Sequence, residues 1–459
     1  MNWSARMIHG ERVTWGNDQP QASGGSHVLY WMQQAQRAHC NHALEYAIEQ
    51  ANALNKPLWV IFALTDAFPE ANARHYRFML EGLAETQAAL RERGIPLVVR
   101  RGAPPDAALE AAAGAACLVT DCGYLRVQRE WRAAVAEQAP CPVAEVESDV
   151  VVPLRTVSNK EEYAARTIRP KLHKYLNRFL VPLKPRTLRQ RDWTPPLSGE
   201  DLSDIGALLK QLDIDHSVPP SSVHRGGYNA AREQLTAFLE HRLSRYASER
   251  NDPNAGAESH MSPYLHFGQI AALEIALTVQ EAAESHTEEC AEAYLEELVV
   301  RRELSMNYVW YNPAYDQFAG LPDWARKTLA EHAGVPREYV YDRAAWEAGD
   351  THDPYWNAAQ REMVKTGKMH NYMRMYWGKK ILEWSAAPEE AFETALYLNN
   401  KYELDGRDPN SFTGVAWCFG KHDRPWAERP VFGKVRYMNA AGLRRKFDAN
   451  AYAAAVDAL

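Results

Sequence analysis

The segment His27–Leu64 decides the fold class, and it reads HVLYWMQQAQRAHCNHALEYAIEQANALNKPLWVIFAL. Its two ends, His27–Trp31 and Leu58–Leu64, are short apolar runs rich in β-branched and aromatic residues, which favour strands. Between them, Gln33–Leu54 has the length and composition of a helix. This order predicts one strand–helix–strand unit of a parallel sheet.

The same alternation continues outward along the first third of the chain. Further strands are predicted at Leu97–Arg101, Cys117–Asp121 and Val143–Val151, and further helices at Glu70–Arg93, Pro105–Ala113 and Val127–Glu137. The pattern predicts an α/β domain over residues 20–155 with a doubly wound, Rossmann-like parallel sheet. No GxGxxG follows the first strand, so we do not expect a nucleotide cofactor to be held here in the Rossmann manner.

The remaining two thirds of the chain have a different composition. Residues 156–227 are basic and Pro-rich, which indicates a linker that is partly helical. Residues 228–459 are almost entirely helical in pattern, with a break at the Asp-, Gly- and Asn-rich stretch Asp405–Gly414. The predicted helices include Asn229–Ser248, Gln269–Ser285, Ala291–Tyr308 and Asn357–Trp384. The architecture is therefore an α/β domain followed by an all-α domain.

Bulk properties exclude several classes of protein. A chain of 459 residues that is 46% hydrophobic favours two domains with real cores. It has no apolar run long enough to cross a membrane, and its N-terminus has no apolar core of a signal peptide. Its six cysteines form no CxxC pair or Cys/His cluster, so we expect reduced thiols, no metal site and a cytoplasmic location.

Charge is distributed unevenly around a net value of −7. Arg155–Arg191 has eleven Lys and Arg against two Glu, and Lys421–Lys446 has eight against two acidic residues. Glu281–Glu297, in contrast, has seven Glu and no Lys or Arg. Separated patches allow one face to bind phosphate despite the negative total. The alternative is that the basic runs are solvated helix faces.

Two short motifs suit a charged cofactor or substrate. Tyr246 precedes the loop Ser259-His260-Met261-Ser262-Pro263, where Ser262 has the position of a helix cap, and free N–H groups at such a point suit a phosphate. Further on, Glu297 lies in an apolar helix, where a buried carboxyl could stay protonated. The alternatives are a simple helix cap and an i,i+4 ion pair between Glu297 and Arg301.

Tryptophan and polar loop residues mark the last third of the chain. Trp377 and Trp384 share a helix face roughly 10 Å apart along the axis, and Trp356 lies just before that helix. Such spacing would let an electron hop between indoles, although core packing is the usual role of tryptophans at helical spacing. The segment Gly420–Met438 combines Arg, Trp and Pro and could insert into a duplex, or merely brace the helices.

Four of these segments together resemble class II cyclobutane pyrimidine dimer photolyases, in the photolyase/cryptochrome superfamily. They are SPYLHFG, DPYWNAAQ, KYELDGRDPN and GKHDRPW followed by ERPVFGKVRYMN, and they occur in the family's order. The resemblance implies an N-terminal antenna-type domain and a helical domain that binds FAD in a U shape. It implies light-driven repair of pyrimidine dimers in double-stranded DNA by a monomer.

The resemblance also implies roles for individual residues. Tyr246 and the loop Glu258, Ser259, His260, Met261 and Ser262 would bind the phosphates and ribose of FAD. Asn371 and Arg374 would face the flavin, with Arg374 paired to Asp405, and Asn399 would lie near flavin N5 and favour the reduced, anionic form. Trp377, Trp356 and Trp384 would be the proximal, middle and distal members of a relay that reduces oxidised flavin in light.

On the substrate side, the resemblance implies that Glu297, Met375 and Trp417 are walls of the pocket that takes the extruded dimer. Arg424 and Trp426 would fill the gap left in the duplex. A protonated Glu297 would donate a hydrogen bond to the dimer radical anion.

Three positions depart from the family pattern. Trp31–Arg37 is less charged than usual, which leaves open whether an antenna chromophore, by family a deazaflavin, is bound. His260 stands in a loop that more often reads Ser-Asn-Leu-Ser, and His352 stands where Gly usually precedes Asp353. The other function considered is a cryptochrome-like blue-light photoreceptor without repair activity; a dark flavoprotein or helical DNA-binding protein is a further alternative.

Overall fold

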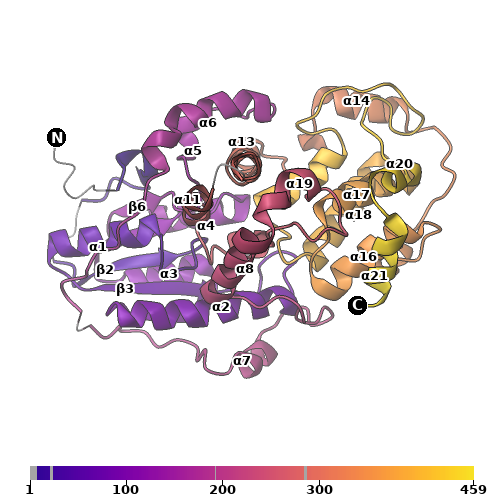
Figure 1. The fold of residues 1–459 in the computed structure, drawn as a ribbon. Coiled ribbons are helices and arrows are strands. Elements are labelled where there is room, and N and C mark those ends of the chain that lie inside the picture. The colour runs from indigo at the N-terminus through magenta and orange to yellow at the C-terminus, as the bar shows by residue number, and fades with distance from the viewer. Residues whose placement is uncertain (1–7, 21–23, 192, 284–286) are drawn as a thin grey trace.

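The computed structural model describes residues 8–20, 24–191, 193–283 and 287–459. Within these ranges a six-stranded sheet forms in the order β1-β6-β5-β2-β3-β4. The strands are β1 (Val13–Trp15), β2 (His27–Met32), β3 (Leu58–Leu64), β4 (Leu97–Arg101), β5 (Ala115–Asp121) and β6 (Val143–Val146). Helices dominate the rest of the chain, as Figure 1 shows with the sheet on one side and the orange and yellow helices on the other.

Helices cover both faces of the sheet, so the predicted doubly wound arrangement is confirmed. Side chains of α1 (His42–Leu54) and α2 (Ala73–Glu92) pack on one face, and those of α3 (Pro104–Ala112) and α4 (Arg126–Gln138) pack on the other. Strands β2 to β6 pair in parallel, which fits their buried, continuously apolar sequences.

The sequence missed one strand and extended another. β1 pairs antiparallel with β6, with Val13 opposite Val146, so the sheet is mixed at this edge. A three-residue edge strand carries too little periodicity to be recognised. β6 ends at Val146 and not at Val151 as predicted, because the chain turns there toward the helical half. The predicted first helix begins at His42 and not at Gln33, since Asn41 caps it with its side chain.

The segment predicted as a linker packs against both halves. Within it, α6 (Ala165–Phe179) contributes to the core of the helical half, while Leu188, Leu202 and α7 (Ile205–Gln211) pack beside the sheet. Short α5 (Leu154–Val157) precedes them.

The helical half follows from residue 228. It contains α8 (Tyr228–His241), α9 (Tyr246–Glu249), α10 (Ser262–His266), α11 (Ala272–Ala282), α12 (Glu288–Leu295), α13 (Arg302–Tyr311), α14 (Asp323–Glu331), α15 (Arg343–Ala348), α16 (Pro354–Thr366), α17 (Asn371–Trp384), α18 (Pro388–Tyr402), α19 (Pro409–Cys418), α20 (Ala440–Lys446) and α21 (Ala449–Asp457). Three-residue 3₁₀ turns occur at Gly10–Arg12, Leu243–Arg245 and Phe318–Gly320.

Several predicted helices are divided. Asn357–Trp384 is two helices, because Gly367 has a left-handed φ of 85° and ends α16. Ala291–Tyr308 contains a π-helical turn at Glu296–Arg301. Asn229–Ser248 ends as α8 at His241 and resumes in α9. The predicted end of another helix at Ser285 lies outside the described residues. α19 begins at Pro409, so the break after α18 is shorter than predicted.

Among the described residues, no helix is both long and apolar enough to span a bilayer.

Candidate functional site

A cluster of buried charges lies where the start of α17 meets the turn after α18. Arg374 Nη2 is 3.4 Å from Asp405 Oδ1, and Lys368 Nζ is 3.2 Å from Asp405 Oδ2. Lys368 also donates to Ser262 Oγ at 2.7 Å, which ties the loop before α10 to the cluster. The predicted ion pair of Arg374 and Asp405 is therefore present, and Lys368 is a member that the sequence did not reveal.

Burial decides the protonation of this cluster. Burial alone would raise the pKa of Asp405, but Lys368 and Arg374 outweigh it and hold that pKa far below its usual range. Glu403, which is fully buried, shows the opposite balance: burial raises its pKa to about 8 despite the nearby guanidinium of Arg374. Glu403 therefore holds its proton more tightly than a free carboxyl does, whereas Asp405 is ionised beside Lys368 and Arg374.

The loop before α10 provides the other wall. Glu258 Oε1 accepts from the backbone N–H of Asn371 at 3.4 Å and lies 3.9 Å from His370 Nε2. Burial would raise the pKa of Glu258, but His370 and Lys368 lower it. Ser262 is the first residue of α10 and not its cap, so the predicted helix cap is wrong; its hydroxyl is engaged by Lys368 instead.

His260 has a left-handed backbone φ of 57°. Asn adopts this region more readily than most residues, which explains why Asn is common at this place in the motif, and His is also enriched there. Met261 is buried beside it, and Ser259 Oγ accepts from the hydroxyl of Tyr294 at 3.2 Å. Tyr246 packs edge-on against Tyr294, with ring centroids 5.2 Å apart. Tyr246 and the five loop residues Glu258–Ser262 therefore lie close together in the helical half.

Unsatisfied buried polar atoms test whether these residues fit a cofactor. Arg374 Nε and His370 Nε2 have no hydrogen-bond partner among the described residues. Glu403 is 3.0 Å from Arg374 but out of line, so both of its oxygens are unpaired as well. Because such groups cost free energy when buried without partners, the donor set fits a polar, anionic cofactor.

Asn399 is buried in the last turns of α18. Its side-chain Nδ2 donates to Ser411 Oγ and, at 3.5 Å, to Asn400 Oδ1. Since the amide nitrogen is engaged in this way, the carbonyl oxygen is the group left to accept a hydrogen bond from a ligand.

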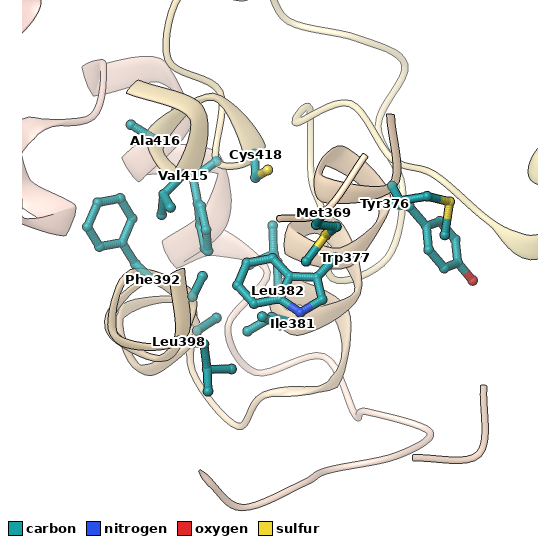
Figure 2. Packing of buried hydrophobic residues seen from close by; sticks show 14 of the residues in the cluster. Met369, Tyr376, Trp377, Ile381, Leu382, Phe392, Leu398, Val415, Ala416 and Cys418 are labelled. Carbon is teal, nitrogen blue, oxygen red and sulfur yellow. The ribbon is translucent and has the colours of Figure 1, made fainter. Parts of the chain in front are cut away.

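Two of the predicted relay tryptophans stack. Trp356 and Trp377 have ring centroids 6.3 Å apart and planes 7° apart. Trp356 Nε1 donates to the Trp377 carbonyl at 3.0 Å, and Trp377 Nε1 donates to Gln360 Oε1 at 2.9 Å, which fixes both rings. Figure 2 shows Trp377 surrounded by apolar residues, including Ile381 and Leu398. The sequence predicted Trp356 just before the helix that carries Trp377 and Trp384. In the structure Trp356 lies within a separate helix, α16, which precedes α17.

A fourth tryptophan, which the sequence reasoning missed, lies between the middle and distal positions. Trp346 is 4.7 Å from Trp356 and 6.3 Å from Trp384 between ring centroids, and its plane is 9° from that of Trp384. It is 1% exposed. The rings therefore follow the order Trp377, Trp356, Trp346 and Trp384 in space. Its signal was weak, because it stands alone in the six-residue α15.

The predicted lesion residues lie on accessible parts of the helical half. The carboxylate of Glu297 is 42% exposed and pairs with Arg250 at 3.3 Å, so the predicted apolar pocket around it is wrong. The alternative Glu297–Arg301 ion pair is also wrong: the π turn places Arg301 3.2 Å from Glu296 and 5.5 Å over the Trp417 ring. Met375 is partly buried, and its carbonyl lies 4.0 Å from the thiol of Cys418 beside Trp417.

Arg424 and Trp426 are exposed, as an intruding loop requires. Arg424 and Arg436 lie 5.2 and 4.9 Å from the Trp426 ring centroid, and its Nε1 donates to Asp423 at 3.1 Å. The loop thus presents an indole flanked by two guanidinium groups.

The chain is 54% identical over 446 residues to "Deoxyribodipyrimidine photo-lyase" of Methanothermobacter thermautotrophicus, covering 97% of this chain and 98% of the relative. The chain belongs to the DNA photolyase family. The family model, DNA photolyase, matches residues 28–189. The family and the fold class predicted from the sequence are therefore confirmed.

Solved photolyase structures share the fold at low identity. A class III photolyase from Agrobacterium tumefaciens has a TM-score of 0.73 and 17% identity, covering 94% of this chain and 86% of that one. An archaeal photolyase from Sulfolobus tokodaii, described with two FAD molecules, has a TM-score of 0.69 and 18% identity over 93% and 88% of the two chains.

This photolyase chain has a cavity at the carboxyl ends of β2 and β3. Its volume is about 820 Å³ with its open mouth included, and its lining includes Trp31, Phe62, Phe68, Trp131, Phe267 and Arg407. Gln33 Nε2, Gln36 Oε1 and Arg407 Nε have no hydrogen-bond partner among the described residues. The less charged segment Trp31–Arg37 therefore lines this cavity, and Arg37 itself is buried and donates to Gly268 O and Ser148 O.

Proposed function

We propose that the protein is a class II photolyase that repairs cyclobutane pyrimidine dimers in double-stranded DNA. The observation that carries this proposal is the buried Lys368–Asp405–Arg374 cluster beside a stacked pair of tryptophans, in a chain of the DNA photolyase family. FAD is the cofactor of this family, and a photoreceptor without repair is not favoured, since the 54% identical relative is named a photo-lyase.

In this proposal the charged cluster binds and tunes the cofactor. FAD, when bound and reduced, supplies the photoexcited electron that opens the cyclobutane ring. Arg374 and Lys368 stabilise negative charge beside them, which favours the anionic reduced form. Asn371 and Asn399 contribute neutral amide groups, and the carbonyl of Asn399 accepts a hydrogen bond without offering an acidic proton. Tyr246 and Glu258–Ser262 hold the phosphate and ribose part.

The accessible face around the π turn takes the lesion. Glu297, Met375 and Trp417 border the site of the extruded dimer, and Arg424 and Trp426 occupy the space it leaves in the duplex. A dimer stacks and pairs poorly, so its extrusion costs less than that of intact bases. Because Glu297 is paired with Arg250, its part in the reaction requires that this ion pair opens when DNA binds.

The tryptophans form the relay that delivers electrons to oxidised flavin in light. The close ring separations of Trp377, Trp356, Trp346 and Trp384 support a path in that order, with Trp346 as an added member. The hydrogen bond from Trp377 Nε1 goes to an amide oxygen, which is a weak base, so an oxidised indole there keeps its proton and passes the charge on.

The cavity at the carboxyl ends of β2 and β3 is the proposed site of an antenna chromophore. Its aromatic walls and unpaired amide groups suit a planar ring system with polar edges, such as a deazaflavin or a second flavin. The archaeal neighbour described with two FAD molecules supports a second chromophore of this kind. A monomer and a cytoplasmic location remain our proposals.

The decisive experiment illuminates the purified, reduced protein with DNA that contains dimers. We expect flavin absorption and a light-dependent loss of dimers. Trp377→Phe should block photoreduction of oxidised flavin yet leave repair by chemically reduced protein within about twofold, because the relay does not carry the repair electron. Flavin binding without any dimer loss would favour the photoreceptor, and loss of both functions in Trp377→Phe would show that its role is misassigned.

A further inference from the structure

A tyrosine and a histidine lie at the outer end of the tryptophan series. The Tyr341 ring packs edge-on against Trp384, with centroids 6.1 Å apart, and the His352 ring is 4.5 Å from Trp384. The backbone N–H of Tyr341 donates to the Trp384 carbonyl at 3.2 Å, which holds the two residues together. The exposed Tyr339 stacks on the other side of His352 at 3.6 Å. The series of rings therefore continues beyond the last tryptophan toward the surface.

The phenol of Tyr341 is hydrogen-bonded to the imidazole. Its Oη is 2.6 Å from Nδ1 of His352, and the backbone N–H of His352 donates to the same Oη at 3.0 Å. In the tautomer with the proton on Nε2, the phenol O–H donates to Nδ1, and Nδ1 is then a base within proton-transfer distance of the phenol.

We propose that Tyr341 and His352 form a redox pair that ends the relay, a role that rests on the electron transfer proposed for the tryptophans. One electron passes from Tyr341 to the one-electron-oxidised indole of Trp384, which returns to its neutral state. The phenolic proton passes to Nδ1 of His352 in the same step. The products are a neutral tyrosyl radical and an imidazolium, so the positive charge moves from Trp384 to His352.

The charges nearby favour this outward transfer. Lys380 Nζ lies 5.0 Å from the Trp384 ring centroid, and it disfavours a positive charge on that indole even though Glu383 partly compensates it. Trp384 is only 4% exposed, whereas His352 is exposed, so water stabilises the charge better on the imidazole. A neutral tyrosyl radical also recombines more slowly, because its proton must return before the electron can.

The pair explains the departure from the family motif at this position. His352 stands where Gly usually precedes Asp353, yet its backbone does not have the positive φ that would require Gly. The substitution is therefore accommodated without strain, and its side chain is committed to Tyr341. His352 thus places a proton acceptor beside Tyr341 at the outer end of the relay.

The test records amino-acid radicals in the oxidised holoenzyme after a light pulse, by transient absorption and electron paramagnetic resonance. We expect a tyrosyl radical in the unaltered protein, and only a tryptophanyl radical, with faster recombination, in Tyr341→Phe. In His352→Gly, tyrosyl formation should slow by about 100-fold, the contribution of a positioned base. Tyr339→Phe is the matched control, since it keeps the phenol–imidazole pair and should keep the tyrosyl radical.

The outcomes separate this inference from the proposed relay. A tyrosyl signal that persists in Tyr341→Phe overturns the pair and leaves the relay standing, and so does an unchanged rate of tyrosyl formation in His352→Gly. If radicals persist in Trp377→Phe, the proposed relay is wrong. The pair would then lack its oxidant, the oxidised indole of Trp384. Repair by chemically reduced Tyr341→Phe should match the unaltered protein, because the pair acts only in photoreduction.

Discussion

The molecule contains two very different candidate sites. The site in the helical half is built from ions: Asp405 is buried between the partly buried Lys368 and Arg374, and Arg374 Nε has no hydrogen-bond partner within the described part of the chain. The cavity beside the sheet is lined mainly by aromatic rings and neutral amides such as Gln33 and Gln36, with Arg407 as the one guanidinium in its described lining. On the functions proposed above, the difference teaches that a group that changes charge needs fixed ions around it, whereas a group that only absorbs light needs shape and a few polar contacts.

The largest effect should follow from removing an ion of the helical site. Arg374→Ala leaves Asp405 with Lys368 alone, and breaking a buried ion pair costs about 3–5 kcal/mol, or a factor of 100 or more. We expect the variant to lose FAD on gel filtration and to lose repair by about that factor. The flavin-to-protein ratio and the rate of dimer loss are the measurements.

Arg361→Ala is the matched control, because Arg361 pairs with Asp457 at the surface and is 39% exposed. It should retain FAD like the unaltered protein. If Arg374→Ala also retained its flavin, the ions of the helical site would not be what holds the cofactor.

The second effect concerns Glu403. Burial raises the pKa of this carboxyl from 4.5 to about 8. The folded protein binds this proton more tightly than the unfolded chain does, so stability falls as the pH rises from about 4.5 to about 8. The shift sets an upper limit of about 5 kcal/mol. Glu403→Gln cannot ionise, so we expect it to gain about 2 kcal/mol relative to the unaltered protein between about pH 5 and pH 8, since relaxation reduces the full value.

Thermal unfolding of both proteins at the two pH values measures this gain, with the exposed Glu393→Gln as the control. The expected gain appears at the higher pH only. An equal difference at both pH values would mean that Glu403 is ionised in the folded protein.

A smaller effect is expected from Trp346→Phe. The variant keeps the packing of the core but removes an indole between Trp356 and Trp384, so we expect photoreduction of oxidised FAD to slow by about tenfold, as for the loss of about 1.4 kcal/mol. Trp324→Phe, in a helix away from the ring series, is the control. A rate equal to that of the unaltered protein would restore the three-member relay predicted from the sequence.

The smallest effect on repair should come from filling the cavity beside the sheet. Ala71→Trp projects a large ring into this cavity, and Ala53→Trp on the exposed face of α1 is the control. We expect loss of any second chromophore, seen in the absorption spectrum, with repair by light absorbed directly by FAD within about twofold. A fall in FAD content similar to that in Arg374→Ala would mean that this cavity and the charged site are not independent.

The sequence predicted the features that depend on residues close together in the chain. Leu58–Leu64 and Leu97–Arg101 form strands with the predicted bounds, because buried parallel strands are continuous apolar runs. Trp377, Arg374 and Asp405 were selected as candidates because they lie in specific motifs. Candidates defined by distant contacts were missed: Lys368 reaches Ser262 across the fold, and the two indoles beside Trp346 come from α16 and α17.

Other errors have local physical causes. The helix predicted from Asn357 to Trp384 ignored Gly367, whose left-handed φ ends α16 so that α17 can begin at the charged cluster. The prediction for Glu297 assumed a regular α-helix. The π turn instead directs the Glu297 side chain toward Arg250. A backbone irregularity of this kind depends on packing and leaves no periodic signal.

Arg74, on α2 beside the sheet, donates to the carbonyls of Met363, Val364 and Tyr402 at 3.1, 2.6 and 2.8 Å. These carbonyls belong to the helical half, so a single guanidinium joins the α/β half to the helical half across 289 to 328 residues of sequence. A protease cut in the basic segment between them would therefore yield a nicked molecule that migrates intact on a native gel and separates only in denaturant. Cleavage of the backbone would therefore not release the α/β half as a separate species.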